Sequence, residues 1–384
     1  MRIALLTDGV FPFVVGGMQR HSGYLAAHLA ARGHEVTLVH AIPWNKPLPT
    51  EEEVRQALNV PSDASFRSVA IRFPKPGFLP GHYIKESYVY SRMIAQRLRE
   101  QWSGFDFIYA KGFSAWHLIH EKSRGLDLPP IGVKFHGYEM FQPAAGLKGR
   151  LEAMMLRGPV KWINQKADLV FSYGGKITPI ILSLGVDVSR IAEIPSAIDE
   201  SWIRREEPTS VSGKRIFVFV GRNERRKGIE ELLKAAASLQ DSFELHIVGP
   251  FAHSARIRNP KVIYHGAVTD TADLRSILDG AHVLILPSWS EGMPNVILEA
   301  MSRGMAVIAT DVGAVGEMVS ESNGWIIEPG SVESLARAMK QSIDADPAVI
   351  DEKRRNSLQR VRNQFVWNVV AERVEAAIIQ SLKR

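Results

Sequence analysis

The stretch HVLILPSWSEGMPNVILEAMSRG, residues 282–304, joins an apolar run, a loop and a helix-like segment in direct succession. Its first six residues are typical of a buried strand. A helix can begin at Pro294, because proline at the first helical position loses only an N–H that makes no helical hydrogen bond, and it can end at Gly304. Glu291 therefore lies in the loop at the carboxyl end of a strand, and Glu299 lies on the helix that follows.

Free backbone amides lie between these two acids, around a helix N-terminus whose dipole favours anions. They belong to Gly292, Met293, Asn295 and Val296. Two carboxylates that accept hydrogen bonds from hydroxyls, next to an anion site, suit a sugar attached to a nucleotide. The alternative is a solvated loop residue at 291 and an ordinary helix acid at 299.

The length of 384 residues, with 45% hydrophobic and 23% charged residues, predicts a globular protein of two domains. The sequence does not open with a secretory signal, and no run approaches the roughly 18 apolar residues of a spanning helix. The lack of cysteine excludes disulfides and cysteine-ligated metals. We expect a cytoplasmic protein, and peripheral association with the inner face of the plasma membrane stays open.

The net charge of +6 is concentrated in residues 1–195, which contain 23 Lys+Arg and 16 Asp+Glu. Most of this excess falls in residues 72–99 and 148–166, where aromatic residues accompany it. The mixture suits an anionic membrane surface or an anionic acceptor, and a solvated helix face over buried aromatics is the alternative. Nucleic acid is not expected as a partner, because no nucleic-acid-binding motif accompanies the charge.

Strand and helix patterns alternate along the chain, which predicts an α/β fold with parallel sheets. Each half begins with a strand, a glycine-bearing turn and a helix, as two Rossmann-like domains would. The expected strands are 2–7, 35–40, 105–110, 130–135 and 168–172, then 215–221, 243–249, 262–264, 282–286, 306–310 and 324–327; the expected helices include 18–32, 229–239 and 365–383. The boundary is expected within residues 194–208, which gives domains 1–197 (with 365–384) and 198–364.

Several residues at strand ends are candidates for chemistry, because ligands bind at the carboxyl edge of such sheets. Gly16 and Gly17 form a turn that lets backbone amides approach a phosphate, although glycines there can be purely conformational. Arg222 follows the strand 215–221 and Lys227 precedes the next helix, so the two can neutralise a leaving diphosphate without a metal. Arg225 and Arg226 are expected to be solvated loop charges.

His136 directly follows the strand 130–135, where a catalytic and a structural role are both open. Glu139 is a candidate partner for it or an acid at the start of a helix. The triplet Asp344-Ala-Asp346 resembles a metal-binding DxD, but it follows a helix away from every strand end and is expected to be solvated. No nucleotide-loop, metalloprotease or hydrolase motif is present. Neither a metal nor a cofactor is expected.

These motifs together resemble the retaining GT-B glycosyltransferases of family 4 (GT4). The resemblance rests on Glu291-x7-Glu299, Gly221-Arg222…Lys227-Gly228, Gly16-Gly17 and the run Arg-Gly-His-Glu-Val at 32–36. It implies two facing Rossmann-like domains, with the donor bound mainly by the C-terminal one, the acceptor by the N-terminal one, and the last helix crossing back to the first domain. Residues 194–199 depart from the usual Pro-Asn-Gly-Val/Ile-Asp.

The resemblance also implies a role for each candidate residue. Glu299 would hold the ribose hydroxyls and Glu291 the donor sugar; Arg222 and Lys227 would bind the diphosphate, Gly17 would donate an amide to it, and His136 would lie beside the transferred sugar. No protein nucleophile is implied, since a donor phosphate oxygen accepts the proton of the acceptor. Electrostatic stabilisation of the diphosphate would then be the main catalytic effect.

The predicted function is a metal-independent, retaining transfer of a sugar from a nucleoside-diphosphate sugar to a cell-surface glycan or lipid-linked acceptor. UDP is favoured over GDP as the nucleotide. A sugar-nucleotide epimerase of the same fold and a non-catalytic nucleotide-sugar-binding subunit are the alternatives.

Overall fold

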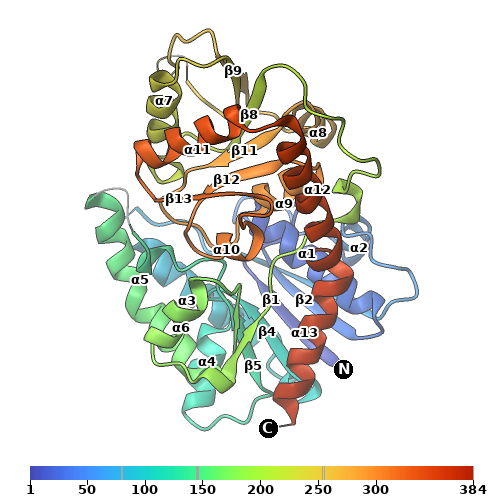
Figure 1. Ribbon diagram of the computed structural model, residues 1–384. Helices are drawn as coiled ribbons and strands as arrows, with labels where there is room; N and C mark the ends of the chain where they lie inside the picture. The colour runs from blue at the N-terminus through green and yellow to red at the C-terminus, as the bar shows by residue number, and fades with distance from the viewer. Residues whose placement is uncertain (79–80, 144–146, 253, 255, 384) are drawn as a thin grey trace.

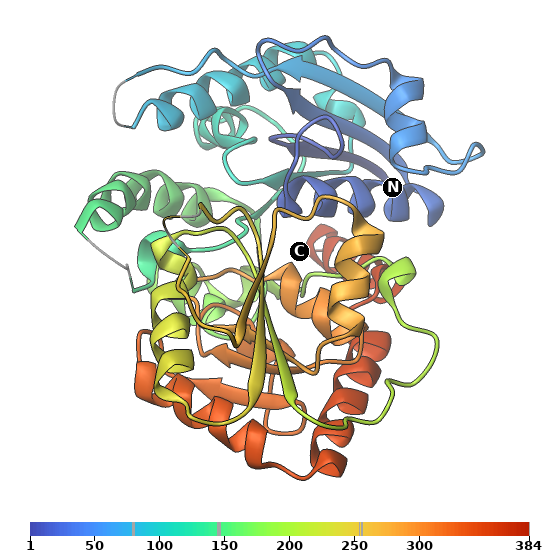
Figure 2. The ribbon, with the colours of Figure 1, turned by 90° about the horizontal axis from the view of Figure 1, so that it is seen from above.

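The computed structural model describes residues 1–78, 81–143, 147–252, 254 and 256–383, with only the backbone of 147–152. Lys148 and Arg150, which the sequence places in the basic segment 148–166, have side chains outside this described part. The chain forms two sheets in two halves that lie against one another (Figures 1 and 2).

The first sheet has seven parallel strands in the order β3-β2-β1-β4-β5-β6-β7 within the described residues. They are β1 (Arg2–Thr7), β2 (Glu35–Ile42), β3 (Phe66–Arg72), β4 (Phe107–Lys111), β5 (Ile131–Lys134), β6 (Leu169–Ser172) and β7 (Ile191–Glu193). The five predicted strands are confirmed, and the two edge strands β3 and β7 were not predicted. The buried runs of β1, β4 and β5 agree with a parallel sheet covered on both faces.

The second sheet has six parallel strands in the order β10-β9-β8-β11-β12-β13, again within the described residues. They are β8 (Arg215–Val220), β9 (Phe243–Val248), β10 (Val262–Gly266), β11 (Val283–Leu286), β12 (Ala306–Thr310) and β13 (Gly324–Ile327). All six were predicted. Both sheets place the strand that begins their half in the interior, so its carboxyl end lies among its neighbours' ends.

Helices connect the parallel strands in both halves (Figure 1). They are α1 (Gly17–Ala31), α2 (Glu51–Ala57), α3 (His82–Arg97), α4 (Trp116–Ser123), α5 (Leu147–Lys166), α6 (Ile177–Ser183), α7 (Ile229–Ser238), α8 (Thr271–Asp279), α9 (Asn295–Ser302), α10 (Val315–Met318), α11 (Val332–Asp344), α12 (Pro347–Gln364) and α13 (Trp367–Leu382). One detail of the prediction is wrong: Pro294 is not the first helical residue of α9 but the extended residue before it (ψ 116°). Gly304, with φ +71°, follows the helix end as expected.

The C-terminal helix α13 crosses back to the first half, as predicted (Figure 1). Its Trp367 ring lies 4.8 Å from that of His21 and 5.6 Å from that of His28, both on α1. At the far end of the contact, Glu375 accepts a hydrogen bond of 2.7 Å from Arg32. Buried apolar side chains of α13 therefore complete the core on this face of the first sheet.

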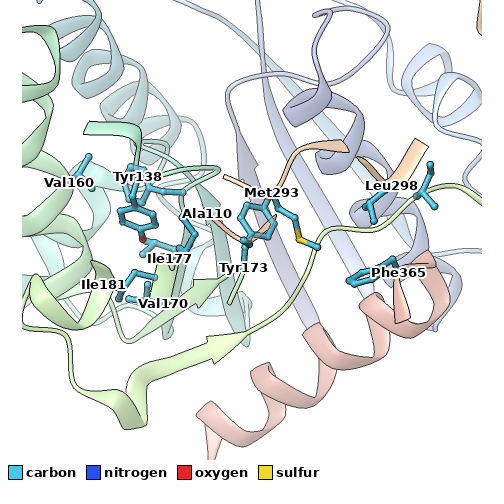
Figure 3. Packing of buried hydrophobic residues seen from close by; sticks show 14 of the residues in the cluster. Ala110, Tyr138, Val160, Val170, Tyr173, Ile177, Ile181, Met293, Leu298 and Phe365 are labelled. Atoms are coloured by element: carbon cyan, nitrogen blue, oxygen red, sulfur yellow. The ribbon is translucent and has the colours of Figure 1, made fainter. Parts of the chain in front are cut away.

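One buried cluster extends across both halves. Met293 and Leu298 of the second half share it with Tyr138 and Tyr173 of the first (Figure 3). Burial of apolar surface stabilises this contact by about 25 cal/mol per Å². The two halves are therefore in apolar contact beside the loop that contains Glu291.

Candidate active site

The loop after β11 meets the first half closely at Gly292. A Cβ atom on Gly292 would lie 1.7 Å from the carbonyl oxygen of His136, so this approach requires glycine. The same loop also packs on its own half, since Ala314 donates a 2.7 Å hydrogen bond to the carbonyl of Gly292. The carboxyl end of β5 and the loop of the two predicted acids are thereby held together.

Glu291 is 6% exposed, and several partners hold its carboxylate. Lys227 lies with its Nζ 2.5 Å from Oε1, and Ser288 donates to the same oxygen at 2.8 Å. Arg226 brings Nη1 to 3.9 Å from Oε2. The backbone of residue 291 is fixed from the first half, because Gln142 donates to its carbonyl at 2.7 Å and accepts from its N–H at 3.3 Å. The structure thus brings Lys227 and Glu291 together.

Arg222 does not join this pair. Its side chain is 68% exposed, and its partner is Glu224, with Nη1 and Oε1 3.0 Å apart. Arg226 is the arginine nearer to Glu291, and its Nε also lies 3.0 Å from Oε2 of Glu224, so the expectation of a solvated loop charge is wrong for it. Arg225 is also engaged: it forms two hydrogen bonds to Glu231 and lies over the Trp289 ring.

The glycine turn of the first half faces the start of α9. A Cβ atom on Gly17 would lie 2.9 Å from Nδ2 of Asn295, and Asn295 accepts a hydrogen bond of 3.1 Å from Ser196. Met293 is buried, and its sulfur accepts a hydrogen bond of 3.0 Å from the backbone N–H of Ser196. Val296 packs against the same core. The predicted amides and Gly16-Gly17 therefore lie at one place between the halves.

Glu299 lies apart from Glu291, in a cavity of about 40 Å³ between the halves. Arg20 and Tyr24 of α1 line the same cavity. Burial raises the pKa of Glu299 to about 6, and the charge of Arg20 opposes this shift. The pair in the sequence motif is thus divided: Glu291 is bound to a lysine, whereas Glu299 faces the opposite half without an ion pair among the described residues.

We expect Glu299→Gln to stabilise the ligand-free protein near neutral pH. The pKa of Glu299 is about 6 in the folded state, and its ordinary value is 4.5. Above pH 6, burying the ionised carboxylate therefore lowers the free energy of unfolding by up to about 2 kcal/mol, and this cost disappears below the ordinary pKa. Urea unfolding of the variant should give a higher free energy of unfolding at pH 7.5 and a much smaller gain at pH 4.5. Glu372→Gln, at an exposed position of α13, is the control; an equal gain at both pH values would contradict the prediction.

His136 lies at the end of β5 with its Nδ1 2.9 Å from the hydroxyl of Tyr173, so its partner is Tyr173 rather than Glu139. Its Nε2 is buried without a hydrogen-bond partner among the described residues. Burial, together with Lys111 and Lys134, holds the pKa of His136 well below its ordinary value. The ring is therefore neutral and free to make one further hydrogen bond to a ligand.

Sequence reasoning missed a group of polar residues around His136. Lys111 lies with Nζ 2.6 Å from Nδ1 of His21, and burial lowers the pKa of Lys134 to about 7. Asp8 directly follows β1 and Lys111 ends β4, so the strand-end signal that identified His136 also applies to them. Gln142 carries no such signal, because it lies in an irregular loop.

Both acids of Asp344-Ala-Asp346 have partners within the chain. Asp344 pairs with Lys340, and Asp346 caps α12. Within the described residues, one group has ligand atoms close enough for a metal ion: His117, His120 and Glu121 of α4, remote from Glu291 in the sequence and in a different half. The described helices include none long and apolar enough to span a bilayer.

Two family models match the chain: "Glycosyltransferase Family 4" over residues 15–202 and "Glycosyl transferases group 1" over residues 214–345. Glycogen synthase from Mycobacterium tuberculosis is 24% identical, with 97% of this chain and 92% of that protein covered. The putative teichuronic acid biosynthesis glycosyltransferase TuaC of Bacillus subtilis is 35% identical over 41% of this chain and 40% of its own. Among solved structures, the sucrose-phosphate synthase from Thermosynechococcus elongatus is 21% identical and superimposes with a TM-score of 0.76 over 99% of this chain and 98% of that one. HepE from Anabaena, solved in complex with UDP, is 16% identical with a TM-score of 0.68 over 99% and 100%.

Proposed function

The chain belongs to the group 1, family 4 glycosyltransferases, and on this premise we propose that it moves a sugar from a nucleoside-diphosphate sugar to a hydroxyl group of a cell-surface glycan or lipid-linked acceptor. The observation that carries the proposal is the Lys227–Glu291 pair at the carboxyl end of β11, beside the N-terminus of α9. A lysine ammonium and a helix N-terminus both stabilise a leaving diphosphate.

Charge stabilisation is the main effect that these residues can supply. At an effective dielectric of about 20, one unit charge 4 Å from another contributes about 4 kcal/mol. We assign this role to Lys227 and the amides at the start of α9. Arg222 and Arg226 both pair with Glu224 at 3.0 Å, and Arg226 also reaches Glu291, so it is the nearer of the two to this site. Glu291 holds Lys227 in place and accepts hydrogen bonds from donor-sugar hydroxyls, and Glu299 accepts those of the ribose.

We assign a retaining course to the transfer. The acceptor oxygen bonds to the anomeric carbon on the face from which the diphosphate departs, and a phosphate oxygen receives the acceptor proton. Neutral His136 makes a hydrogen bond to the transferred sugar and carries no charge in this scheme. Product analysis by NMR tests the course, since an inverted anomeric configuration would contradict it.

UDP is the proposed nucleotide, supported by the fold shared with HepE, which was solved with UDP. At equal concentrations, UDP should raise the melting temperature more than GDP or ADP, because a ligand at 100 times its Kd stabilises the folded state by about 2.7 kcal/mol. The shift should persist in EDTA and be reduced in Lys227→Ala. A larger shift with GDP or ADP would assign the donor to that nucleotide instead.

Donor turnover distinguishes the proposal from the two alternatives. A transferase releases nucleoside diphosphate in proportion to the product formed, and hydrolyses the donor slowly without an acceptor. Conversion of the donor sugar without release would identify an epimerase. Donor binding with neither release of nucleoside diphosphate nor conversion of the sugar would identify a non-catalytic subunit.

We also propose that the first half contacts an anionic membrane surface. Phe78 is 98% exposed and Met154 62% exposed, and Gly81, three residues after Phe78, lies beside Met155 of α5. The helices α3 and α5 of the same half also contain basic residues: Lys85, Arg92, Arg97, Arg157 and Lys161. Exposed apolar side chains among basic ones are typical of interfacial binding.

Flotation with liposomes that contain 30% phosphatidylglycerol should therefore recover the protein at low salt, and much less at 0.5 M salt. Phe78→Ala is expected to lower the recovered fraction severalfold. Val188→Ala, at an exposed apolar residue elsewhere in this half, serves as the control. Equal recovery with neutral liposomes would contradict an electrostatic contact.

A further inference from the structure

Two adjoining cavities lie in the first half, on the side of His136 that faces the ends of β1 and β3. The inner cavity, of about 270 Å³, reaches His136 and Lys111. The outer cavity, of about 400 Å³, reaches Trp44. Asp8, Phe73 and Tyr83 line both, so the two cavities share one wall.

The inner cavity combines aromatic walls with a polar end. The rings of Phe73 and Tyr83 are stacked with centroids 6.4 Å apart, and Phe113 meets Tyr83 edge-on at 6.3 Å. At the polar end lie His136, Lys111, Asp8 and Glu139. The lining of this end includes one lysine and two carboxyl groups, and the charge of Asp8 acts on Lys111. The lining therefore has no excess of positive charge that would select an anionic ligand.

The outer cavity has one large ring and several groups that form hydrogen bonds. Trp44 is 46% exposed, and Lys75 lies with Nζ 5.2 Å from the centroid of its ring. Gln19, Asn45 and Asp8 supply amide and carboxyl groups. A pyranose ring presents apolar C–H groups on its face and hydroxyls at its edge, so it matches an aromatic ring with amides around it. A lipid chain would offer no hydrogen bond to the amide of Asn45 or the carboxyl group of Asp8, whereas sugar hydroxyls can pair with both.

We propose that the acceptor is a neutral glycan of at least two sugar units, with the reacting unit in the inner cavity and the next unit against Trp44 in the outer one. The inference rests on the proposed transferase function and adds to it the class of acceptor. In the reaction, the hydroxyl oxygen of the inner unit bonds to the anomeric carbon of the donor and the bond from that carbon to the diphosphate breaks. The proton of the hydroxyl leaves with the nucleoside diphosphate.

The test compares acceptors of different length. The probes are methyl glycosides of glucose, galactose, mannose and N-acetylglucosamine, each as the monosaccharide and as its disaccharides, with UDP-glucose, UDP-galactose and UDP-N-acetylglucosamine as donors. For the best series, kcat/KM of the wild-type protein should be at least tenfold higher for the disaccharide. Trp44→Ala should remove this gain and leave both the monosaccharide rate and donor hydrolysis within twofold. Trp44→Phe should restore most of the gain.

Leu48→Ala is the matched control, since Leu48 follows Trp44 in the same loop, is 45% exposed and lines neither cavity. Equal kcat/KM of the wild-type protein for monosaccharides and disaccharides would overturn the proposal. An equal decrease in kcat/KM for both kinds of acceptor in Trp44→Ala would overturn it as well. Donor hydrolysis without transfer to any disaccharide would overturn it too. Failure of the transferase function looks different, because the wild-type protein would then release no nucleoside diphosphate from any donor.

Discussion

Replacement of Lys227 by alanine is expected to lower kcat by about 10²–10³-fold, which corresponds to roughly 3–4 kcal/mol. The reason is that alanine removes a positive charge that is already held in place when negative charge develops on the leaving diphosphate. Nζ of Lys227 lies 2.5 Å from Glu291, and both side chains are largely shielded from solvent. Steady-state kinetics with saturating donor and acceptor measure the effect.

The variant also leaves Glu291 without its main partner, so lost stability has to be separated from lost catalysis. An unpaired buried charge costs about 3–5 kcal/mol, which urea unfolding would detect. The double variant Lys227→Ala/Glu291→Gln should regain most of the stability and none of the activity. Lys214→Ala, at the opposite end of β8, is the control and should keep full activity. A kcat for Lys227→Ala within threefold of wild type would refute the assigned role.

Gly292→Ala is expected to lower kcat more than 100-fold while each half stays folded. Since the new Cβ would lie 1.7 Å from the carbonyl oxygen of His136, the two halves have to separate at this point. Separation moves the acceptor cavities away from the donor site, and displacement of about 1 Å can cost 10²-fold in rate. Small-angle scattering should show a larger radius of gyration, and UDP binding should be largely retained.

Gly158→Ala is the matched control for this variant. Gly158 lies within α5, and a Cβ atom there would meet no atom within 4 Å. Alanine in a helix interior is more favourable than glycine by about 0.5–1 kcal/mol, but Pro159 follows and disfavours helical backbone at a preceding residue with a Cβ atom. The two effects oppose each other, so this variant should be active and about as stable as the wild-type protein. Unchanged scattering and full activity in Gly292→Ala would show that the close contact at His136 is not needed for transfer.

The sequence predicted the strands that are buried on both faces and missed those at the edge of the first sheet. β1 and β11 are continuous apolar runs, whereas β3 alternates exposed and buried residues and contains Arg67 and Arg72. A half-exposed edge strand has no continuous apolar run, and its basic residues continue into the charged segment from Arg72 onward, so no strand pattern stands out there. Three-residue β7 is too short to give a pattern at all.

In the candidate site, too, positions that depend on local sequence were predicted, and those that depend on tertiary contacts were not. Lys227, Glu291 and His136 could be placed because each lies at the carboxyl end of a strand or at a helix start. The separate positions of Glu291 and Glu299 depend on which side chains of the other half they meet, and no spacing rule encodes this. Which arginine lies closer to Glu291, Arg226 or Arg222, likewise depends on the conformation of a short loop.

The return of α13 to the first half has a consequence for how the protein is made. Trp367, Val370, Val374 and Ile378 are part of the core beside α1, together with Leu25 and Leu29. Domains generally fold as they leave the ribosome, in order from the N-terminus. Here the first half to be synthesised cannot complete its core until the last residues of the chain emerge. A nascent or truncated chain that ends after α12 would therefore expose apolar surface and depend on chaperones, so translation has to finish before either substrate site is fully built.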